Sequence, residues 1–334
     1  MSRLRLGILG TGRIAGDYLA ALEEVPELEL AGLCDLLPER VAALGERFGA
    51  AQYSSLEAML AAGSLDAVLV ATPPKTHESL AVQCLAAGLH VLCEKPFALG
   101  LAAAKRMLSA AKRAQRTLTM SAKFRHVPDV IEAKAKIEAG ALGKLVLAEN
   151  SFTAPVPMQG RWNADPDIAG GGVLIDNGTH SVDLMRYLFG EIRWIEALPC
   201  VPVQELPVED GVRLLLGWDS GLLGHVDLSW SLSKHSAEYL LAHGDLASLG
   251  LGWAGSWKQR RGDSAALAFG SGYAKRVAFV RQLGHFARLA LGEEPALITE
   301  QAILASVAVV ECGYRSLAAG GARVSVPIAQ ELAS

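Results

Sequence analysis

The chain has 334 residues, with 31 Lys and Arg against 35 Asp and Glu, so its net charge is −4 at pH 7 and no nucleic-acid partner is expected. Apolar residues make up 51% of the chain and charged residues 20%, a composition that excludes an intrinsically disordered protein. At roughly 150 residues per domain, the length predicts about two soluble domains, each with its own hydrophobic core.

Residues 1–122 alternate short apolar runs with Ala- and Leu-rich helical stretches, at the spacing of a parallel βαβ sheet. Helices are predicted at Glu78–Ala87 and Leu101–Ala114, whose near-continuous apolar content fits elements that pack against a sheet. Strands are predicted at Leu4–Leu9, Leu28–Cys34, Ala51–Tyr53, Ala67–Ala71, His90–Cys93 and Thr117–Ala122. We therefore predict a doubly wound α/β domain over residues 1–122.

A glycine-rich turn follows the first strand, where Gly10, Gly12 and Ala15 match the pattern GxGxxA. The first glycine permits a tight turn, and the second lets backbone N–H groups approach a pyrophosphate at a helix N-terminus. Alone, this pattern would also fit an ordinary strand-to-helix turn. Asp35 lies roughly 20 residues further on, where an acidic side chain accepts hydrogen bonds from the adenosine ribose; the alternative is a helix N-cap.

Asp35 also predicts the choice of cofactor. Its carboxylate would repel the additional phosphate of NADP, and only Arg40 among the residues that follow could offset that repulsion. We therefore predict NAD as the cofactor, with NADP as the alternative.

Proline-containing segments follow the fourth and fifth strands, with the sequences VATPPKTH over residues 70–77 and CEKP over residues 93–96. Pro73 and Pro74 either line the nicotinamide side of the sheet or form a simple turn that ends the strand. We expect His77 to start a helix rather than to act as a second base. Pro96 restricts the backbone that presents Lys95, and a cis peptide bond between these two residues is one option.

After residue 122 the pattern changes to longer strands joined by tight turns. Strands at Leu214–Trp218 and Leu222–Trp230 flank a hairpin turn, and a further strand is predicted at Tyr239–Ala242. Helices are predicted at Asp129–Ala139, Ala274–Leu291 and Glu300–Leu317. We predict that residues 123–334 form an α+β domain with a mostly antiparallel sheet. Because both faces of the hairpin are apolar, we expect one face to contact a second subunit, giving a homodimer or homotetramer.

The chain shows no signal of export or membrane insertion. Arg13 and Asp17 interrupt the first apolar stretch, and no later run reaches the roughly 18 apolar residues of a membrane span. The five cysteines are scattered, without the close pairs of a zinc site or a redox motif. We expect a cytoplasmic protein with reduced thiols, no metal site and no membrane partner.

A third motif, GGGVLIDNGTH over residues 170–180, leads into a helix that carries Asp183. Together with the glycine turn and the two proline-containing segments, it closely resembles the Gfo/Idh/MocA oxidoreductase family, which includes glucose-fructose oxidoreductase and inositol dehydrogenase. The resemblance covers nearly the whole chain. It implies an NAD(P)-binding Rossmann domain, a C-terminal domain with an open sheet, and hydride transfer on sugars or related polyols.

In the family, the residues that match Lys95, Asp176 and His180 form the catalytic set, and oxidation of a secondary alcohol explains the need for them. The reaction requires a hydride acceptor and a base, and histidine, whose unperturbed pKa lies near neutrality, is the natural residue type for that base, which points to His180. Lys95 would stabilise negative charge on the reacting oxygen, and Asp176 would position the substrate. Asp176 and His180 are four residues apart, so both can point to one face of a helix. Separately, Lys95 could equally face solvent, and His180 could pack against a helix.

The substrate pocket is less clearly marked. Arg125 is equally consistent with a pocket and with a surface position, while Trp162 and Asn163 could supply an apolar wall and a hydrogen bond to a sugar. The glycines of residues 170–172 would let the backbone approach the ligand closely. Expected substrate contacts are Lys95, Arg125, Trp162, Asp176, Asn177 and His180. Expected cofactor contacts are Gly10, Thr11, Gly12, Arg13, Ile14, Asp35, Thr72, Pro73, His77, Glu94 and Lys95.

The residues do not distinguish a free sugar from a polyol, a sugar phosphate or a nucleotide sugar. Two other functions remain open: a glycosidase that retains NAD for a transient oxidation, and a non-catalytic NAD-binding regulator. The presence of the complete catalytic set argues against the regulator.

Overall fold

A computed structural model describes residues 3–332, which divide into two compact units. The first unit contains the chain up to Lys123 together with Arg276–Ile303, and the second contains Phe124–Lys275 together with the residues from Leu304 onward. The sequence-based division into 1–122 and 123–334 assigns Lys123 and residues 276–303 to the second part, whereas both lie in the first compact unit.

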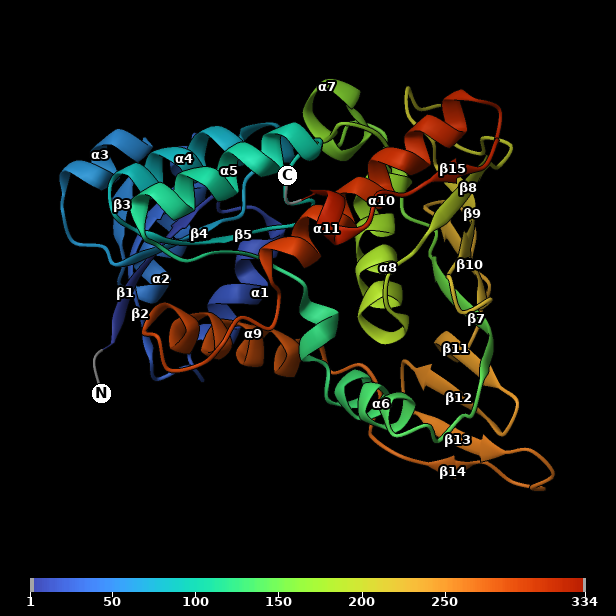
Figure 1. Cartoon of the computed structure of the whole chain (residues 1–334). Coiled ribbons are helices and arrows are strands. Elements are labelled where there is room, and N and C mark those ends of the chain that lie inside the picture. The colour runs from blue at the N-terminus through green and yellow to red at the C-terminus, as the bar shows by residue number, and fades with distance from the viewer. Residues whose placement is uncertain (1–2, 333–334) are drawn as a thin grey trace. The chain divides into compact units, whose positions relative to one another are not determined.

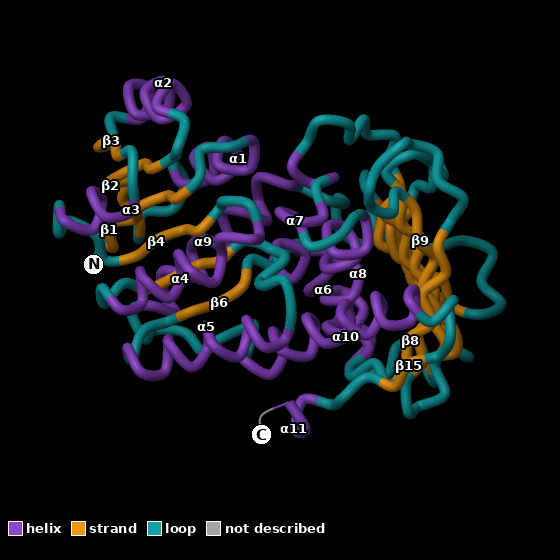
Figure 2. The backbone as a smooth tube through the Cα atoms, turned by 90° about the horizontal axis from the view of Figure 1, so that it is seen from above, coloured by secondary structure: helices purple, strands orange, loops and turns teal. Residues whose placement is uncertain are grey.

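The first unit is built on a six-stranded sheet in which every neighbouring pair is parallel, as predicted. The strand order is β3-β2-β1-β4-β5-β6 (Figure 2), the order of a Rossmann fold. Its strands are β1 (Leu4–Leu9), β2 (Leu28–Cys34), β3 (Ala51–Tyr53), β4 (Ala67–Val70), β5 (His90–Cys93) and β6 (Leu118–Met120). Its helices are α1 (Arg13–Leu22), α2 (Pro38–Phe48), α3 (Leu56–Ala61), α4 (His77–Ala86), α5 (Leu101–Ala114) and α9 (Lys275–Ala290).

Helix α9 belongs to the first unit because of its apolar face. Phe279, Leu283 and Phe286 recur at helical spacing and are buried in one core with Tyr18 of α1 and with strands of the parallel sheet. The ring of Phe279 packs edge-on against the ring of Tyr18, with 4.6 Å between the ring centroids. Helices α1, α2 and α9 thus cover one face of the sheet, and α3, α4 and α5 cover the other (Figure 1).

The second unit contains a nine-stranded sheet in the order β14-β13-β12-β11-β7-β10-β9-β8-β15. Only the pair β7 and β10 is parallel, so the predicted mostly antiparallel sheet is confirmed. Its strands are β7 (Leu145–Thr153), β8 (Trp194–Pro199), β9 (Gly211–Gly217), β10 (Leu223–Ser229), β11 (Glu238–Gly244), β12 (Ala247–Gly252), β13 (Trp257–Arg260), β14 (Leu267–Ala268) and β15 (Val324–Ser325). Its helices are α6 (Pro128–Glu138), α7 (Pro166–Ala169), α8 (Val173–Phe189), α10 (Glu300–Ala318) and α11 (Ala329–Leu332).

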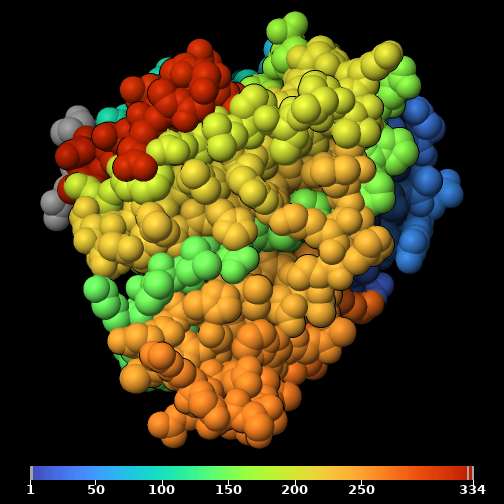
Figure 3. Space-filling view, turned by 90° about the vertical axis from the view of Figure 1, so that its right-hand side faces the viewer, coloured from blue at the N-terminus to red at the C-terminus, as the bar shows by residue number. Residues whose placement is uncertain are grey.

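Helices α6, α8 and α10 lie on one face of the nine-stranded sheet, and no helix among the described residues of the second unit covers the other face (Figure 1). Figure 3 shows that face, on which β7 lies between β11 and β10, two strands that come later in the sequence. The second unit also holds all six tryptophans of the chain, Trp162, Trp194, Trp218, Trp230, Trp253 and Trp257.

Candidate active site

Four strands of the first unit end at the same level of the sheet. Leu9 of β1 pairs with Cys34 of β2 and with Val70 of β4, and Val70 in turn pairs with Cys93 of β5. The segments after these strands therefore leave the sheet along one carboxyl edge. They contain the glycine turn, Asp35, Thr72 and Lys95. Ligands of open α/β sheets bind outside this edge, where the strand order reverses.

The glycine turn has the geometry of a phosphate-binding loop. Gly10 has φ +90°, and a Cβ atom there would lie 2.6 Å from the carbonyl oxygen of Ala71. Gly12 precedes α1, which has no side-chain cap, and a Cβ atom on Gly12 would meet nothing within 4 Å. The N-terminus of α1 is thus open to an anion. Of the other predicted contacts in this turn, Thr11 is buried, Ile14 is half-buried and Arg13 is exposed.

Asp35 is fixed to the glycine turn by its own hydrogen bonds. Its Oδ2 accepts hydrogen bonds from the backbone N–H of Thr11 at 2.7 Å and from the Thr11 hydroxyl at 3.0 Å. Its Oδ1 accepts one from the backbone N–H of Leu37 at 3.0 Å. The N-cap position of α2 is Leu37, without a side-chain cap, so Asp35 is not the N-cap of that helix.

Lys95 is half-buried between two buried neighbours, and its peptide bond to Pro96 is cis. Its backbone N–H donates a hydrogen bond to Glu94 Oε2 at 3.0 Å. Glu94 Oε1 accepts hydrogen bonds from the hydroxyls of Tyr18 and Ser121. The Glu94 carboxylate is thus buried, and both of its oxygens accept hydrogen bonds from within the unit. Its expected contact with the cofactor stays a prediction.

His77, like Glu94, makes its hydrogen bonds within the first unit. It begins α4, as predicted, and its ring is fully buried. Its Nδ1 lies 2.9 Å from the carbonyl oxygen of Pro96, and its Nε2 lies 2.8 Å from that of Thr72. Burial lowers the pKa of the imidazole. His77 therefore links the segments after β4 and β5, and its expected contact with a cofactor stays a prediction. Pro73 is half-buried beside Thr72.

The second unit presents a polar face on α8. This helix is buried almost all round, but Asp176, Asn177 and His180 in its first two turns are half-buried. Residues four apart on a helix lie on the same side, so Asp176 and His180 share a face. The ring of Phe124 packs edge-on against the His180 ring, with 5.4 Å between the centroids.

Arg125 is buried and paired within the second unit, and its expected contact with the substrate stays a prediction. Its Nε and one terminal nitrogen donate to the two carboxylate oxygens of Asp183 at 2.9 and 2.7 Å, and both side chains are buried. The guanidinium also lies over the ring of Tyr187, 5.0 Å from its centroid. Arg125 therefore anchors the segment before α6 to α8. Trp162, in contrast, is exposed at the start of a short 3-10 helix, Trp162–Ala164.

The glycine triplet approaches protein groups of the same unit. A Cβ atom on Gly171 would clash with the hydroxyl of Tyr314, and one on Gly172 would clash with the carbonyl oxygen of Glu209. These two glycines thus allow close packing at the start of α8, and the expected approach of a ligand to the triplet stays a prediction. No local motif marks Glu209 or Tyr314 in the sequence, since both act across long separations.

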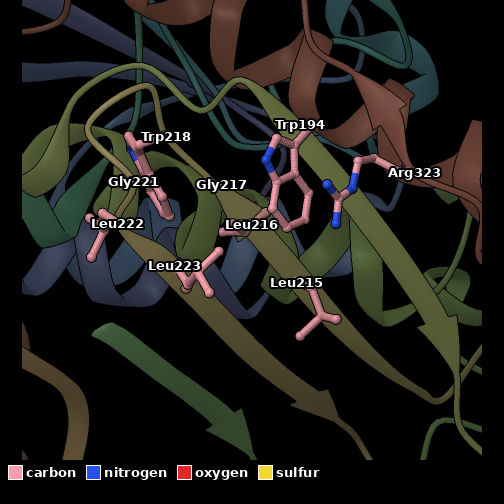
Figure 4. Close-up of a pocket in the computed structure, with 10 residues that line it drawn as sticks. Trp194, Leu215, Leu216, Gly217, Trp218, Gly221, Leu222, Leu223 and Arg323 are labelled. Atoms are coloured by element: carbon pink, nitrogen blue, oxygen red, sulfur yellow. The ribbon is translucent and has the colours of Figure 1, made fainter. Parts of the chain in front are cut away.

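A hollow of about 470 Å³ lies over β8, β9 and β10, outside all the predicted site residues (Figure 4). Trp194, Trp218, Leu215 and Leu223 line it, and Arg323 lies over the Trp194 ring at 3.7 Å from the centroid. Within residues 3–332 there is no cluster of three or more His, Cys, Asp or Glu side chains able to hold a metal ion. Among those residues, no helix is both long and apolar enough to cross a membrane.

Two protein-family models match most of this chain. Residues 4–122 match the model described as "Oxidoreductase family, NAD-binding Rossmann fold", and residues 130–250 match the "GFO/IDH/MocA C-terminal domain". D-apiose dehydrogenase of Paraburkholderia graminis is 31% identical over 234 residues, which are 69% of this chain but only 62% of that enzyme. Myo-inositol 2-dehydrogenase of Thermotoga maritima is 29% identical, with 68% of each chain aligned.

Among solved structures, levoglucosan dehydrogenase in complex with NADH superposes with a TM-score of 0.90 at 20% identity. The superposition covers 98% of this chain and 100% of that one. At this level of identity, the likeness shows a shared fold.

Proposed function

Because the chain belongs to the Gfo/Idh/MocA oxidoreductase family and carries its NAD-binding Rossmann domain, we propose that it is an NAD-dependent dehydrogenase or reductase of a sugar, cyclic polyol or sugar derivative. The observation that carries the proposal is the carboxyl edge of the six-stranded sheet. One edge collects an open helix N-terminus for a pyrophosphate, an acidic residue after β2 for a ribose, and Lys95 after β5.

The residues of this edge fit a dinucleotide. The open space at Gly12 and the uncapped start of α1 would admit the pyrophosphate, and Asp35 would accept hydrogen bonds from the ribose hydroxyls. Thr72 and Pro73 would lie beside the nicotinamide. When bound, the nicotinamide supplies or accepts the hydride.

We assign the other roles in the reaction to Lys95, Asp176 and His180. In the oxidation direction His180 takes the hydroxyl proton, while the Lys95 ammonium donates a hydrogen bond to the reacting oxygen and stabilises its negative charge. Asp176 holds the substrate, with Asn177 beside it on the same helix. The same groups serve the reduction direction in reverse, because the proton taken by His180 is then returned.

The charge of Asp35 leads to a prediction about cofactor preference. We expect kcat/KM with NAD to exceed that with NADP by about tenfold or more, equivalent to about 1.4 kcal/mol. Asp35→Asn removes the charge but retains an oxygen that can accept from the Thr11 N–H, so the preference should fall. Glu39→Gln, a charge loss at an exposed position in the first turn of α2, is the matched control. A wild-type kcat/KM that is comparable with NAD and NADP would contradict the proposed hydrogen bonds from the ribose to Asp35.

The activity itself is tested by NADH absorbance after incubation with a panel of inositols, aldoses, sugar phosphates and nucleotide sugars. We expect net formation of NADH with at least one alcohol, or its consumption with the corresponding ketone. Hydrolysis of a glycoside without net NADH would indicate the NAD-retaining glycosidase instead. NAD binding without turnover across the panel, in both directions, would indicate the non-catalytic regulator.

We also propose that the chain forms a homo-oligomer through the nine-stranded sheet. The support is the helix-free face of the sheet, on which Leu223 is exposed and Leu215 is half-buried beside the hollow of Figure 4. Apolar side chains gathered on an exposed sheet face are typical of a protein–protein interaction site. Sedimentation should give a dimer or tetramer at micromolar concentration, and a monomer at that concentration would rule this interface out.

A further inference from the structure

The N-terminus of α8 is capped by two residues that are distant in the sequence. A helix leaves its first N–H groups without partners inside the helix, and the residue before α8, Gly172, has no side chain to satisfy them. Glu209 Oε1 accepts hydrogen bonds from the N–H groups of Gly172 at 3.0 Å and Leu174 at 3.1 Å. The Glu209 carbonyl oxygen accepts one from Val173 at 2.9 Å.

Tyr314 of α10 completes this cap. Its hydroxyl oxygen accepts a hydrogen bond from the N–H of Ile175 at 3.2 Å, and its proton is donated to Glu209 Oε1 at 2.8 Å. Burial and the adjacent Glu209 charge raise the pKa of the Tyr314 phenol well above its usual range, so the hydroxyl keeps the proton that it donates. Four consecutive N–H groups, Gly172 to Ile175, are thereby held by one carboxylate side chain, one carbonyl and one hydroxyl.

The sequence of the turn before α8 fits this arrangement. Side chains on Gly171 and Gly172 would occupy the positions of the Tyr314 hydroxyl and the Glu209 carbonyl, so glycine is required for both groups to reach the helix. A carboxylate is also the favoured partner for the positive end of a helix dipole. Asp176 follows directly after the capped N–H groups, and His180 lies one turn later.

We propose that Glu209 and Tyr314 are positioning residues for the reaction, which fix the first turns of α8 and thereby the side chains of Asp176 and His180. This inference rests on the proposed function. Neither residue is required to touch the substrate. Catalytic groups must be held within a fraction of an ångström, since a misplacement of 1 Å can cost about 10²-fold in rate.

The test compares Glu209→Ala with the conservative Glu209→Gln, and adds Tyr314→Phe. Glu209→Ala removes the shared acceptor, and Tyr314→Phe removes only the hydroxyl that serves Ile175 and Glu209. We expect each of these two variants to lower kcat by about 10- to 10²-fold. The affinity for NAD should stay unchanged, because the proposed cofactor residues lie on a different unit. Glu209→Gln retains an acceptor oxygen and should recover most of kcat.

Hydrogen exchange supplies a readout that does not depend on activity. The amides of Gly172 and Leu174 should exchange at least about tenfold faster in Glu209→Ala than in the wild type, and the amide of Ile175 should do so in Tyr314→Phe, because each loses its acceptor. Ser55→Ala is the control, because it removes an ordinary side-chain cap from α3 and should change neither kcat nor exchange at α8.

The outcomes separate this inference from the proposed function. Faster exchange at residues 172–175 with unchanged kcat in an active enzyme would overturn the positioning role. Unchanged exchange of the Ile175 amide in Tyr314→Phe, which retains the ring and its packing, would overturn the role of Tyr314 in the cap, and unchanged exchange of Gly172 and Leu174 in Glu209→Ala would overturn that of Glu209. A wild-type protein without dehydrogenase activity would contradict the proposed function, while the exchange measurement would still decide whether the cap exists.

Discussion

Lys95→Ala is expected to lower kcat by about 10²- to 10⁴-fold while NAD binds with nearly unchanged affinity. The lysine follows β5 at the carboxyl edge of the parallel sheet and is half-buried, so its ammonium acts where water screens it only partly. Loss of that ammonium leaves the developing charge on the reacting oxygen without its donor. The effect should therefore appear in kcat and not in the binding of the dinucleotide at the glycine turn.

Steady-state kinetics together with direct titration of NAD binding would check this prediction. Lys95→Met keeps most of the aliphatic stem and should lose as much activity as Lys95→Ala, which separates loss of charge from loss of packing. Lys144→Ala, which removes an exposed lysine of the second unit, should behave as the wild type. A Lys95→Ala enzyme that binds NAD and retains near-normal turnover would contradict the assignment of Lys95 to the catalytic set.

Arg125→Ala is expected to lower the free energy of unfolding of the second unit by about 3–5 kcal/mol. Arg125 and Asp183 form a bidentate pair in which both side chains are buried. Removal of the guanidinium leaves the Asp183 carboxylate buried, with the Ser306 hydroxyl at 3.3 Å as a much weaker partner. Arg186 also interacts electrostatically with Asp183, but this interaction does not replace the lost bidentate pair. The penalty is that of a buried charge compensated only in part, which exceeds the net contribution of the intact pair.

Tryptophan fluorescence during urea unfolding is suited to this measurement, because all six tryptophans report on the second unit. The double variant Arg125→Met, Asp183→Leu replaces both charges with apolar groups and should recover much of the lost stability. Arg125→Ala without a measurable shift of the unfolding midpoint would show that Asp183 finds another partner or admits water.

The features that could be predicted from the sequence are those that depend on neighbouring residues. The strands Leu4–Leu9, Leu28–Cys34 and His90–Cys93 have the predicted bounds, because short apolar runs between helical segments identify buried parallel strands. The glycine turn, Asp35 and Lys95 each follow such a strand directly. Once the sheet is known to be parallel, their common edge follows from the topology alone.

The features that escaped prediction depend on partners far away in the chain. Arg125 looked equally suited to a pocket, because nothing in its own segment shows that Asp183 neutralises it 58 residues later. The inward hydrogen bonds of Glu94 and His77 could not be predicted either, because their partners are Tyr18, Ser121 and backbone carbonyls of other segments. The cap on α8 by Glu209 and Tyr314 is of the same kind.

The late position of α9 in the sequence affects the order in which the protein can fold during synthesis on the ribosome. Domains usually fold in the order in which they are synthesised. Here all six strands of the parallel sheet have been synthesised by residue 120. One side of the core of that sheet, however, also needs Phe279, Leu283 and Phe286, which are synthesised much later. The buried hydrogen bonds from Gln282 to Tyr18 and Ser121, next to Glu94, can likewise form only after α9 has been synthesised. The part of the chain that emerges first therefore completes its core only after nearly the whole second unit has been translated.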